Sequence, residues 1–276
     1  MTGGGCFPWL AGGSVPVSAS TASASTRSAS TGPAPTRPAV QYLVVRYAKR
    51  GKMRFASHRD VARAFERGVR KAGLPIAYSA GFTPHPKISY PGGAPTCVAS
   101  EAEYLSLALT APQAETQVCQ RLNAALPDGI DVIDVTELEG TSGGASPGAG
   151  TTFGHLEASE WEVVLPGVEP AAAGLAVAAF LARDEAPVER VTDKGVRQFD
   201  ARAAVLEMRV SEHSAAIGNE DCAILRMVVL HTAPAVRPED VLTALFGQDG
   251  IAPSSPSMTT RLAQGPRALL AGKGTS

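Results

Sequence analysis

Cysteine is scarce in this chain of 276 residues, and its four cysteines, Cys6, Cys97, Cys119 and Cys222, lie far apart. No two are close enough to form a local zinc or iron–sulfur motif, so we expect neither a metal nor a cofactor.

Apolar runs long enough to cross a bilayer are missing, which excludes a membrane helix. The start of the chain also lacks the basic and long apolar regions of a secretory signal, so we expect a cytoplasmic protein.

The sequence also lacks the short motifs that are typical of common enzyme families. The chain contains no Walker loop, G-x-G-x-x-G, H-E-x-x-H or G-x-S-x-G pattern. We therefore expect a protein that is not an enzyme on its own.

Net charge is small, with 25 Lys and Arg against 26 Asp and Glu, but the charges are unevenly placed. Between Gln41 and Tyr90 eleven side chains are basic and two are acidic, a local charge of +9, so the rest of the chain sums to -10. Such a segment favours a polyanionic partner, most simply RNA. An acidic protein partner or a merely solvated helix face would also fit this distribution.

Composition divides the chain into five parts. Residues 1–39 are dominated by Ser, Ala, Thr, Gly and Pro, which predicts a disordered tail. Residues 140–156 read as a flexible linker for the same reason, and residues 266–276 as a second tail. The remaining parts, 40–139 and 157–265, each have enough chain for a core of their own. We therefore predict two domains in an α+β protein.

Periodicity in the first domain predicts the order β-α-β-β-α-β of a ferredoxin-like fold. The strands are expected at 41–47, 74–78 with 87–90, 103–110 and 130–138, and the helices at 57–72 and 112–126. Ser57 and Asp60 form a variant of the capping box that opens the first helix.

The second domain shows a similar alternation, which predicts another ferredoxin-like unit in tandem with the first. Strands are expected at 161–165, 188–192, 199–210, 222–231 and 258–262, and helices at 170–182 and 238–246. The two halves share no residue-level identity, so the duplication rests on pattern alone.

Basic residues recur at every fourth position of the first predicted helix, which places them in one row on its surface. Together with the preceding strand and turn they form the predicted phosphate-binding surface, and a proline-stiffened loop adds an aromatic ring for base stacking. The predicted nucleic-acid contacts are Arg46, Lys49, Arg50, Lys52, Arg59, Arg63, Arg67, Lys71, Phe82, His85 and Lys87.

A catalytic alternative uses His58, Asp60 and His85 as an acid–base group in a nuclease or transferase, and it requires the three to meet in one pocket. Each of the three residues also has a purely structural interpretation, in which His58 packs at the helix start, Asp60 caps the helix and His85 shapes a turn.

Several segments carry a family resemblance. They are VRYAKRG at 45–51, RFASHRD at 54–60, AFER at 64–67, RKAGLP at 70–75, AYSAGFTPHPK at 77–87, SEAEYL at 100–105, VER at 188–190, GVRQFD at 195–200 and TRLAQGP at 260–266. The chain resembles the radical-SAM-linked family of domains of unknown function, in its stand-alone actinobacterial form. Cys97 departs from the family, where glycine is common at that position.

The resemblance implies a separate radical-SAM protein as partner, because this chain has no C-x-x-x-C-x-x-C to hold the cluster of such an enzyme. Combined with the basic segment, it favours an accessory protein that presents tRNA or rRNA to that enzyme. The alternatives are the nuclease or transferase above and a pure protein adaptor.

Overall fold

The computed structural model describes residues 37–138, 152–192, 195–211, 215–217, 220–247 and 253–271. Most of the predicted tail over 1–39 and of the predicted linker over 140–156 lies outside these residues. Within the described part, no helix is long and apolar enough to cross a bilayer. The described residues belong to one compact unit.

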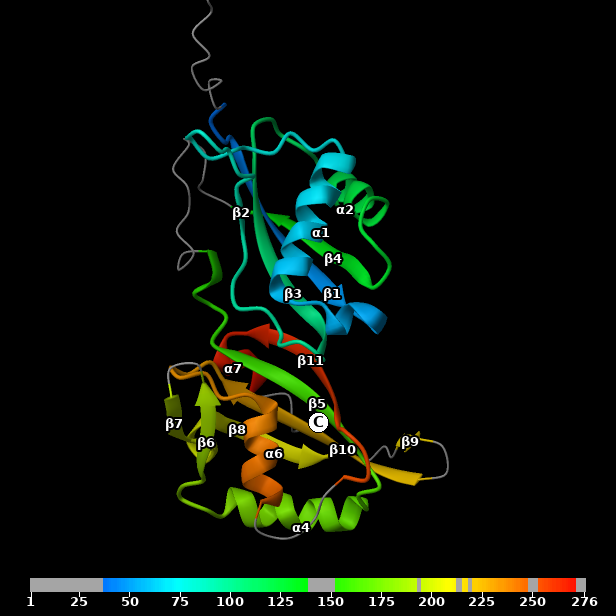
Figure 1. Ribbon diagram of the computed structural model, residues 1–276, viewed down its shortest axis with the longest axis vertical. Coiled ribbons are helices and arrows are strands. Elements are labelled where there is room, and N and C mark those ends of the chain that lie inside the picture. Colours follow the sequence, from blue (N-terminus) through cyan, green and yellow to red (C-terminus); the bar gives the residue numbers. More distant parts are fainter. Residues whose placement is uncertain are drawn as a thin grey trace, which may run out of the picture. The chain divides into compact units, whose positions relative to one another are not determined.

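The first half of this unit follows the predicted order of elements (Figure 1). It consists of β1 (Gln41–Lys49), the 3-10 turn η1 (Gly51–Phe55), α1 (His58–Lys71), β2 (Ile88–Ser89), β3 (Ala99–Leu109), α2 (Glu115–Asn123) and β4 (Ile130–Glu137). The predicted strand at 74–78 is wrong, because that segment makes only isolated bridges from Ile76 and Tyr78. Pro75 within it has no backbone N–H to donate to a ladder.

The second half contains more elements than predicted. They are β5 (Ala158–Pro166), α4 (Pro170–Leu181), β6 (Pro187–Thr192), β7 (Gly195–Asp200), α5 (Ala201–Ala204), β8 (Val205–Val210), β9 (Ala215–Ile217), β10 (Glu220–Leu230), α6 (Pro238–Phe246), β11 (Met258–Gly265) and α7 (Arg267–Leu270). The single strand predicted at 199–210 is broken by α5. The Asp200 carboxylate causes the break, because it accepts hydrogen bonds from the backbone N–H groups of Arg202 and Ala203.

One mixed sheet runs through both halves. Its strands lie in the order β4-β1-β3-β11-β5-β10-β8, with β2 on β3 and β9 on β10. The halves join where β11 pairs in parallel with the start of β3, at Thr260 opposite Ala99 and Arg261 opposite Ser100. The described chain is therefore a mixed α+β fold with one continuous sheet, where the sequence predicted two tandem domains.

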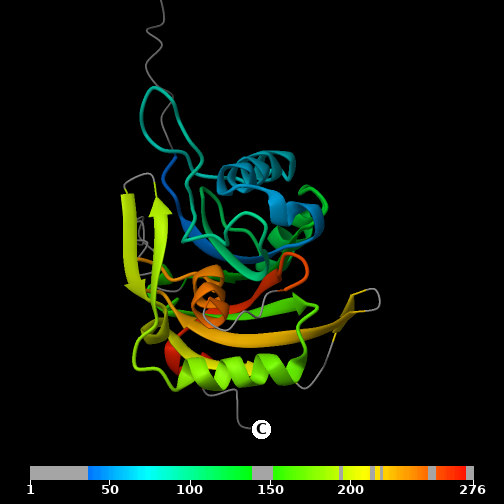
Figure 2. The same cartoon turned by 60° about the horizontal axis from the view of Figure 1, so that its bottom comes forward.

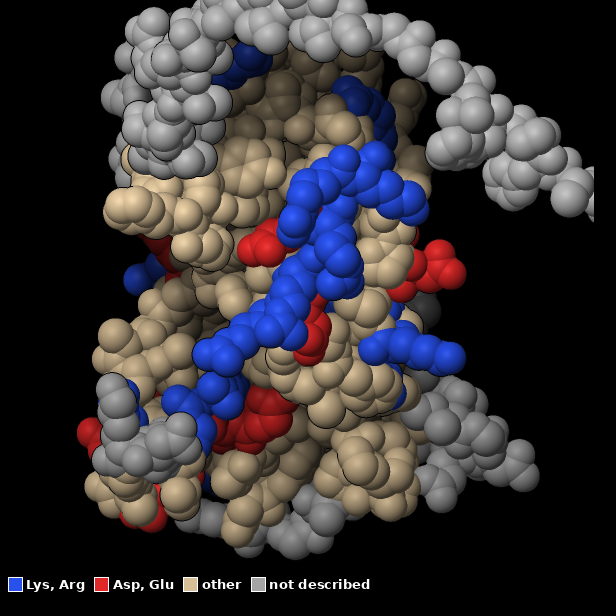
Figure 3. All heavy atoms as spheres, turned by 45° about the horizontal axis from the view of Figure 1, so that its top comes forward, with Lys and Arg blue, Asp and Glu red and all other residues tan. Residues whose placement is uncertain are grey.

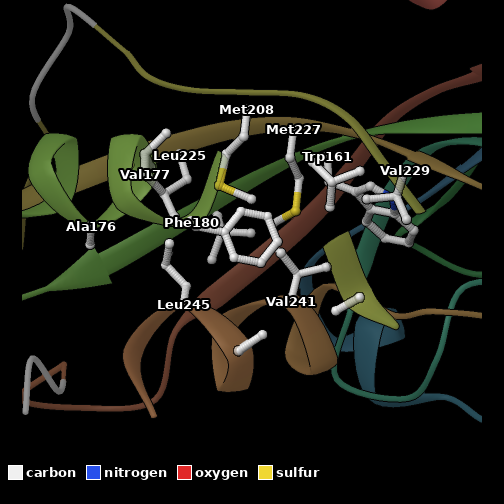
Figure 4. Packing of buried hydrophobic residues seen from close by; sticks show 14 of the residues in the cluster. Trp161, Ala176, Val177, Phe180, Met208, Leu225, Met227, Val229, Val241 and Leu245 are labelled. Carbon is white, nitrogen blue, oxygen red and sulfur yellow. The ribbon is translucent and has the colours of Figure 1, made fainter. Parts of the chain in front are cut away.

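Each half has its own apolar core between helices and sheet. In the first half, α1 and α2 cover the face of β1 that carries Leu43, Val45 and Tyr47 (Figure 1). In the second half, α4 and α6 pack around Phe180, toward which Met208 and Met227 point (Figure 4). These two cores hold α1 at one end of the sheet and α6 at the other.

A two-stranded hairpin, β6–β7, forms a separate small sheet beside the second half (Figure 2). Its tip leaves Val191 and Val196 exposed.

Candidate nucleic-acid interface

Helix α1 presents the predicted basic row to solvent. Its buried face consists of Val61, Ala64, Phe65, Gly68 and Val69, and all of these except Gly68 belong to the apolar core of the first half. The remaining positions are set by the 3.6-residue repeat, so residues at steps of four share the outer face. Arg59, Arg63, Arg67 and Lys71 are all exposed there. Figure 3 shows basic side chains as a continuous band on this side of the molecule.

The start of α1 is fixed by a complete capping box. The Asp60 N–H donates to Ser57 Oγ at 3.2 Å, and the Ser57 N–H donates to Asp60 Oδ2 at 3.2 Å. The hydrogen bond from the Ser57 hydroxyl lowers the pKa of the Asp60 carboxyl, with a smaller contribution from the charge of Arg63. The carboxylate therefore stays ionised at the N-terminus of the helix, where the macrodipole favours negative charge.

Most of the row is not neutralised by neighbours. Glu66 is engaged by Arg70, whose Nε donates to the Glu66 carbonyl at 2.9 Å and whose Nη2 lies 3.8 Å from its carboxylate. Among the described residues, no ion pair is formed by Arg59, Arg67 or Lys71 within the 4.0 Å that defines one. Like charges at this spacing disfavour the helix by a few tenths of a kcal/mol per pair.

The four predicted basic residues before α1 occupy four different environments. Arg46 lies on the face of β1 opposite the α1 core, because side chains alternate along a strand. Lys49 is only 3% exposed, and its ammonium donates to the carbonyls of Ala94 and Pro95 at 3.3 and 3.1 Å. Arg50 forms ion pairs with Glu101 and Asp131. Lys52 is exposed.

The loop after α1 presents the predicted aromatic residue. The side chain of Phe82 is 99% exposed, and His85 and Lys87 are exposed near it in sequence. The loop is held at its base, where the His85 N–H donates to Ser79 Oγ at 3.0 Å and the Lys87 N–H donates to the Ala77 carbonyl at 2.8 Å. A ring this exposed forms no part of the core.

The three residues of the catalytic alternative have separate contacts. Asp60 binds Ser57 in the helix cap. The ring of His58 packs edge-on against Tyr90, with centroids 5.5 Å apart. No hydrogen bond found among the described residues joins His58 to Asp60 or to His85. The described residues also include no group of three His, Cys, Asp or Glu side chains that could hold a metal ion.

A buried ionic cluster at the junction of the halves was not predicted from the sequence. Arg261 Nη1 donates to Glu103 Oε1 at 2.9 Å, and the Ala94 N–H donates to Glu103 Oε2 at 2.9 Å. Burial raises the pKa of the nearby Tyr47 and lowers that of Lys49. The sequence alone could not identify the partner of the Glu103 carboxylate, because Arg261 lies 158 positions away. The two side chains meet only because β11 pairs with β3.

Comparisons with curated proteins and with solved structures do not identify a relative of this chain. No curated protein matches the chain. An unknown protein from Galdieria sulphuraria aligns at 13% identity over 80% of this chain and 98% of its own, with a TM-score of 0.21. DyPB from Rhodococcus jostii RHA1 aligns at 12% identity over 87% of this chain and 97% of its own, with a TM-score of 0.22. Structural likeness at this level does not indicate a shared fold.

The family comparison is of a different kind, because it matches the sequence pattern of a family over more than half of the chain. Residues 42–238 match the family described as uncharacterized proteins conserved in bacteria, DUF2344. This range begins in β1 and ends at the first residue of α6, so it includes α1, the exposed loop and the strand that carries Glu103. The chain therefore belongs to the DUF2344 family of bacterial proteins.

Proposed function

We propose that this protein binds RNA through the outer face of α1 and acts as a non-catalytic accessory protein. The observation that carries the proposal is the row of exposed cations at Arg59, Arg63, Arg67 and Lys71. At 1.5 Å per residue the row extends about 18 Å along the helix. Along the axis of double-stranded DNA the phosphates of one strand are spaced about 3.4 Å apart, so a row of this length can reach several phosphates of a nucleic-acid backbone.

The exposed loop supplies the second part of the proposed interface. Phe82 offers a π-face on which an unpaired base stacks, and Lys87 adds a cation for the adjoining phosphate. Single-stranded loops and ends of RNA present such unstacked bases, whereas a continuous duplex does not. Structured RNA with exposed loops, such as tRNA or rRNA, is therefore the proposed ligand. Lys49 and Arg50 are left out of this interface, because one is buried and the other is paired.

The resemblance noted in the sequence adds a separate radical-SAM protein as the proposed partner, with the present chain presenting RNA to it in the cytoplasm. The two halves also support a more specific fold proposal, two ferredoxin-like units fused edge to edge. The order β4-β1-β3 with β2 on β3 in the first half has its counterpart in β11-β5-β10-β8 in the second.

The test is binding of the full chain to fluorescently labelled total tRNA over a series of salt concentrations. The variant Arg63→Glu with Arg67→Glu reverses two central charges of the row. We expect it to weaken binding at least about tenfold at low salt, since phosphate contacts dominate such affinity. The control is Arg197→Glu with Arg209→Glu, which makes the same change at two exposed arginines of β7 and β8. It should bind nearly as the wild type does.

The proposal fails if the two double variants bind tRNA equally well, or if wild-type affinity does not change with salt. Capture of an acidic protein by the α1 face, without competition by tRNA, would establish the protein-adaptor alternative instead. Co-purification of the tagged full chain with a radical-SAM protein tests the partner separately.

A further inference from the structure

A cavity of about 440 Å³ lies at the junction of the two halves. One wall comes from the loop at Pro91–Gly93, and the opposite wall comes from the end of β10 and the segment leading into α6. Trp161, Arg261 and Gln264 of β5 and β11 also line it. Its position is distinct from the outer face of α1.

The described residues that line this cavity include two arginines, Arg261 and Arg237, and no carboxylate. Glu103 stands behind Arg261 and binds its Nη1. The ammonium of Lys49 lies behind the same loop, bound to the carbonyls of Ala94 and Pro95. Counting these four groups, the site holds three positive charges against one negative charge.

Arg261 is 6% exposed and held in place by two contacts. Its guanidinium carbon lies 4.5 Å from the centroid of the Trp161 ring, and Nη1 is bonded to Glu103. Its Nε is buried and has no hydrogen-bond acceptor among the described residues. Arg261 lines the cavity, and its guanidinium has more donors than its one carboxylate partner uses, so a further acceptor in the cavity would stabilise it.

His231, which also lines the cavity, contributes no charge to it. Its Nδ1 lies 2.7 Å from the Leu156 carbonyl and its Nε2 lies 2.7 Å from Ser159 Oγ. Because a carbonyl only accepts, Nδ1 carries the proton and Nε2 accepts from the serine hydroxyl. Burial lowers the pKa of this ring, which keeps it neutral.

We propose that this cavity is a binding site for a small organic anion, with a carboxylate, sulfonate or phosphate on Arg261 and an apolar body against the other walls. Phe153, Leu156, Trp161 and Val236 supply those apolar walls. A pocket of a few hundred cubic ångströms with mainly apolar walls and few fixed polar groups is the usual form of a small-molecule site.

The test compares two dyes that share a skeleton and differ in charge. 8-Anilinonaphthalene-1-sulfonate (ANS) is anionic, and N-phenyl-1-naphthylamine lacks the sulfonate. The full chain has two tryptophans, so a Trp9→Phe background leaves Trp161 as the only energy-transfer donor. We expect saturable 1:1 binding of ANS with energy transfer from Trp161. The neutral dye should bind at least about tenfold more weakly, as expected for loss of a charge-assisted hydrogen bond.

The deciding variant is Arg261→Gln combined with Glu103→Gln, which removes both charges of the pair and leaves neither buried alone. It should raise the Kd of ANS at least about tenfold and leave that of the neutral dye within about twofold. Equal binding of the two dyes by the parent protein, or unchanged ANS affinity in this variant, would overturn the proposal.

A second pair of variants keeps the test decisive if the double variant does not fold. Gly92 lines the cavity and has open space around the position of a Cβ atom, so Gly92→Leu should weaken ANS binding. Gly174→Leu makes the same change at an equally open glycine of α4 and should bind ANS normally. Arg63→Gln with Arg67→Gln removes two positive charges from the basic row on α1, which lies outside the cavity. This variant should also leave ANS binding unchanged. Equal affinity in the two leucine variants would refute the site, as would loss of binding in the α1 variant.

Discussion

Glu103 and Arg261 form an ion pair in which both side chains are almost fully buried. Replacing Glu103 by Gln leaves the guanidinium of Arg261 buried without a counter-charge. We expect Glu103→Gln to lower the free energy of unfolding by about 3–5 kcal/mol. The measurement is denaturant unfolding followed by circular dichroism.

Glu101→Gln is the matched control for this substitution, because Glu101 pairs with Arg50 at the surface. Exposed pairs contribute about 0–1 kcal/mol, so the control should unfold close to the wild type. Equal losses in the two variants would mean that burial at the junction adds nothing to the energy of the pair.

His231 gives a pH dependence whose sign follows from its environment. Burial lowers the pKa of the ring below its ordinary value of 6.5, so the unfolded chain takes up the proton before the folded chain does. Stability should therefore fall as the pH decreases from about 6.5 toward the folded-state pKa. Above 6.5 the ring is neutral in both states and adds no pH dependence.

His231→Asn removes this titration and leaves the carboxyl groups in place. Its free energy of unfolding should change less between pH 7 and pH 5 than that of the wild type. Denaturant unfolding at several pH values measures both slopes, and identical slopes would contradict the expected linkage.

Helix α1 depends on the capping residues at its start. Ser57→Ala removes the hydroxyl that accepts from the Asp60 N–H and binds its carboxylate. Loss of such a cap costs about 1 kcal/mol, within a range of 0.5–2 kcal/mol. We also expect the pKa of Asp60 to rise in this variant, because the hydrogen bond from Ser57 is the main cause of its lowering.

Chemical denaturation measures the first effect and a side-chain NMR titration measures the second. Ser89→Ala, at an exposed position of the short strand β2, is the control. An unchanged pKa of Asp60 in Ser57→Ala would show that other groups hold the carboxylate.

Local sequence signals were sufficient for the elements that carry strong caps or long periodic runs. The capping residues of α1 and the leading proline of α6 predicted both helices, and α6 was predicted at its observed bounds. The exposed row on α1 followed from the helical repeat. The burial of Lys49 and the pairing of Arg50 did not, because both depend on segments about fifty or more positions away. The β3–β11 pairing could not be predicted from local sequence either, because the two strands are about 160 positions apart in the chain.

Because one sheet passes through both cores, we expect the described chain to unfold in a single cooperative transition. Leu105→Ala in the first core and Leu225→Ala in the second remove matched, fully buried side chains. Each should cost about 2–5 kcal/mol and shift the whole transition. Calorimetry together with near- and far-ultraviolet circular dichroism provides the measurement.

Two domains that fold independently would behave differently. In each leucine variant, the half that carries the substitution would then unfold at a lower temperature than in the wild type. The other half would keep its wild-type midpoint. That outcome would restore the two-domain organisation predicted from the sequence.

The edge of β3 is shared between two strands from distant parts of the chain. β2 pairs with it at Leu107 and Ser106, and β11 pairs at Ala99 and Ser100. A fragment limited to residues 37–138 would keep β2 and lose β11, so part of this edge would have no hydrogen-bonding partner. Unpaired edges recruit strands from other molecules. The fragment should therefore self-associate as its concentration rises, and the C-terminal strand would serve the intact protein as an intramolecular guard against aggregation.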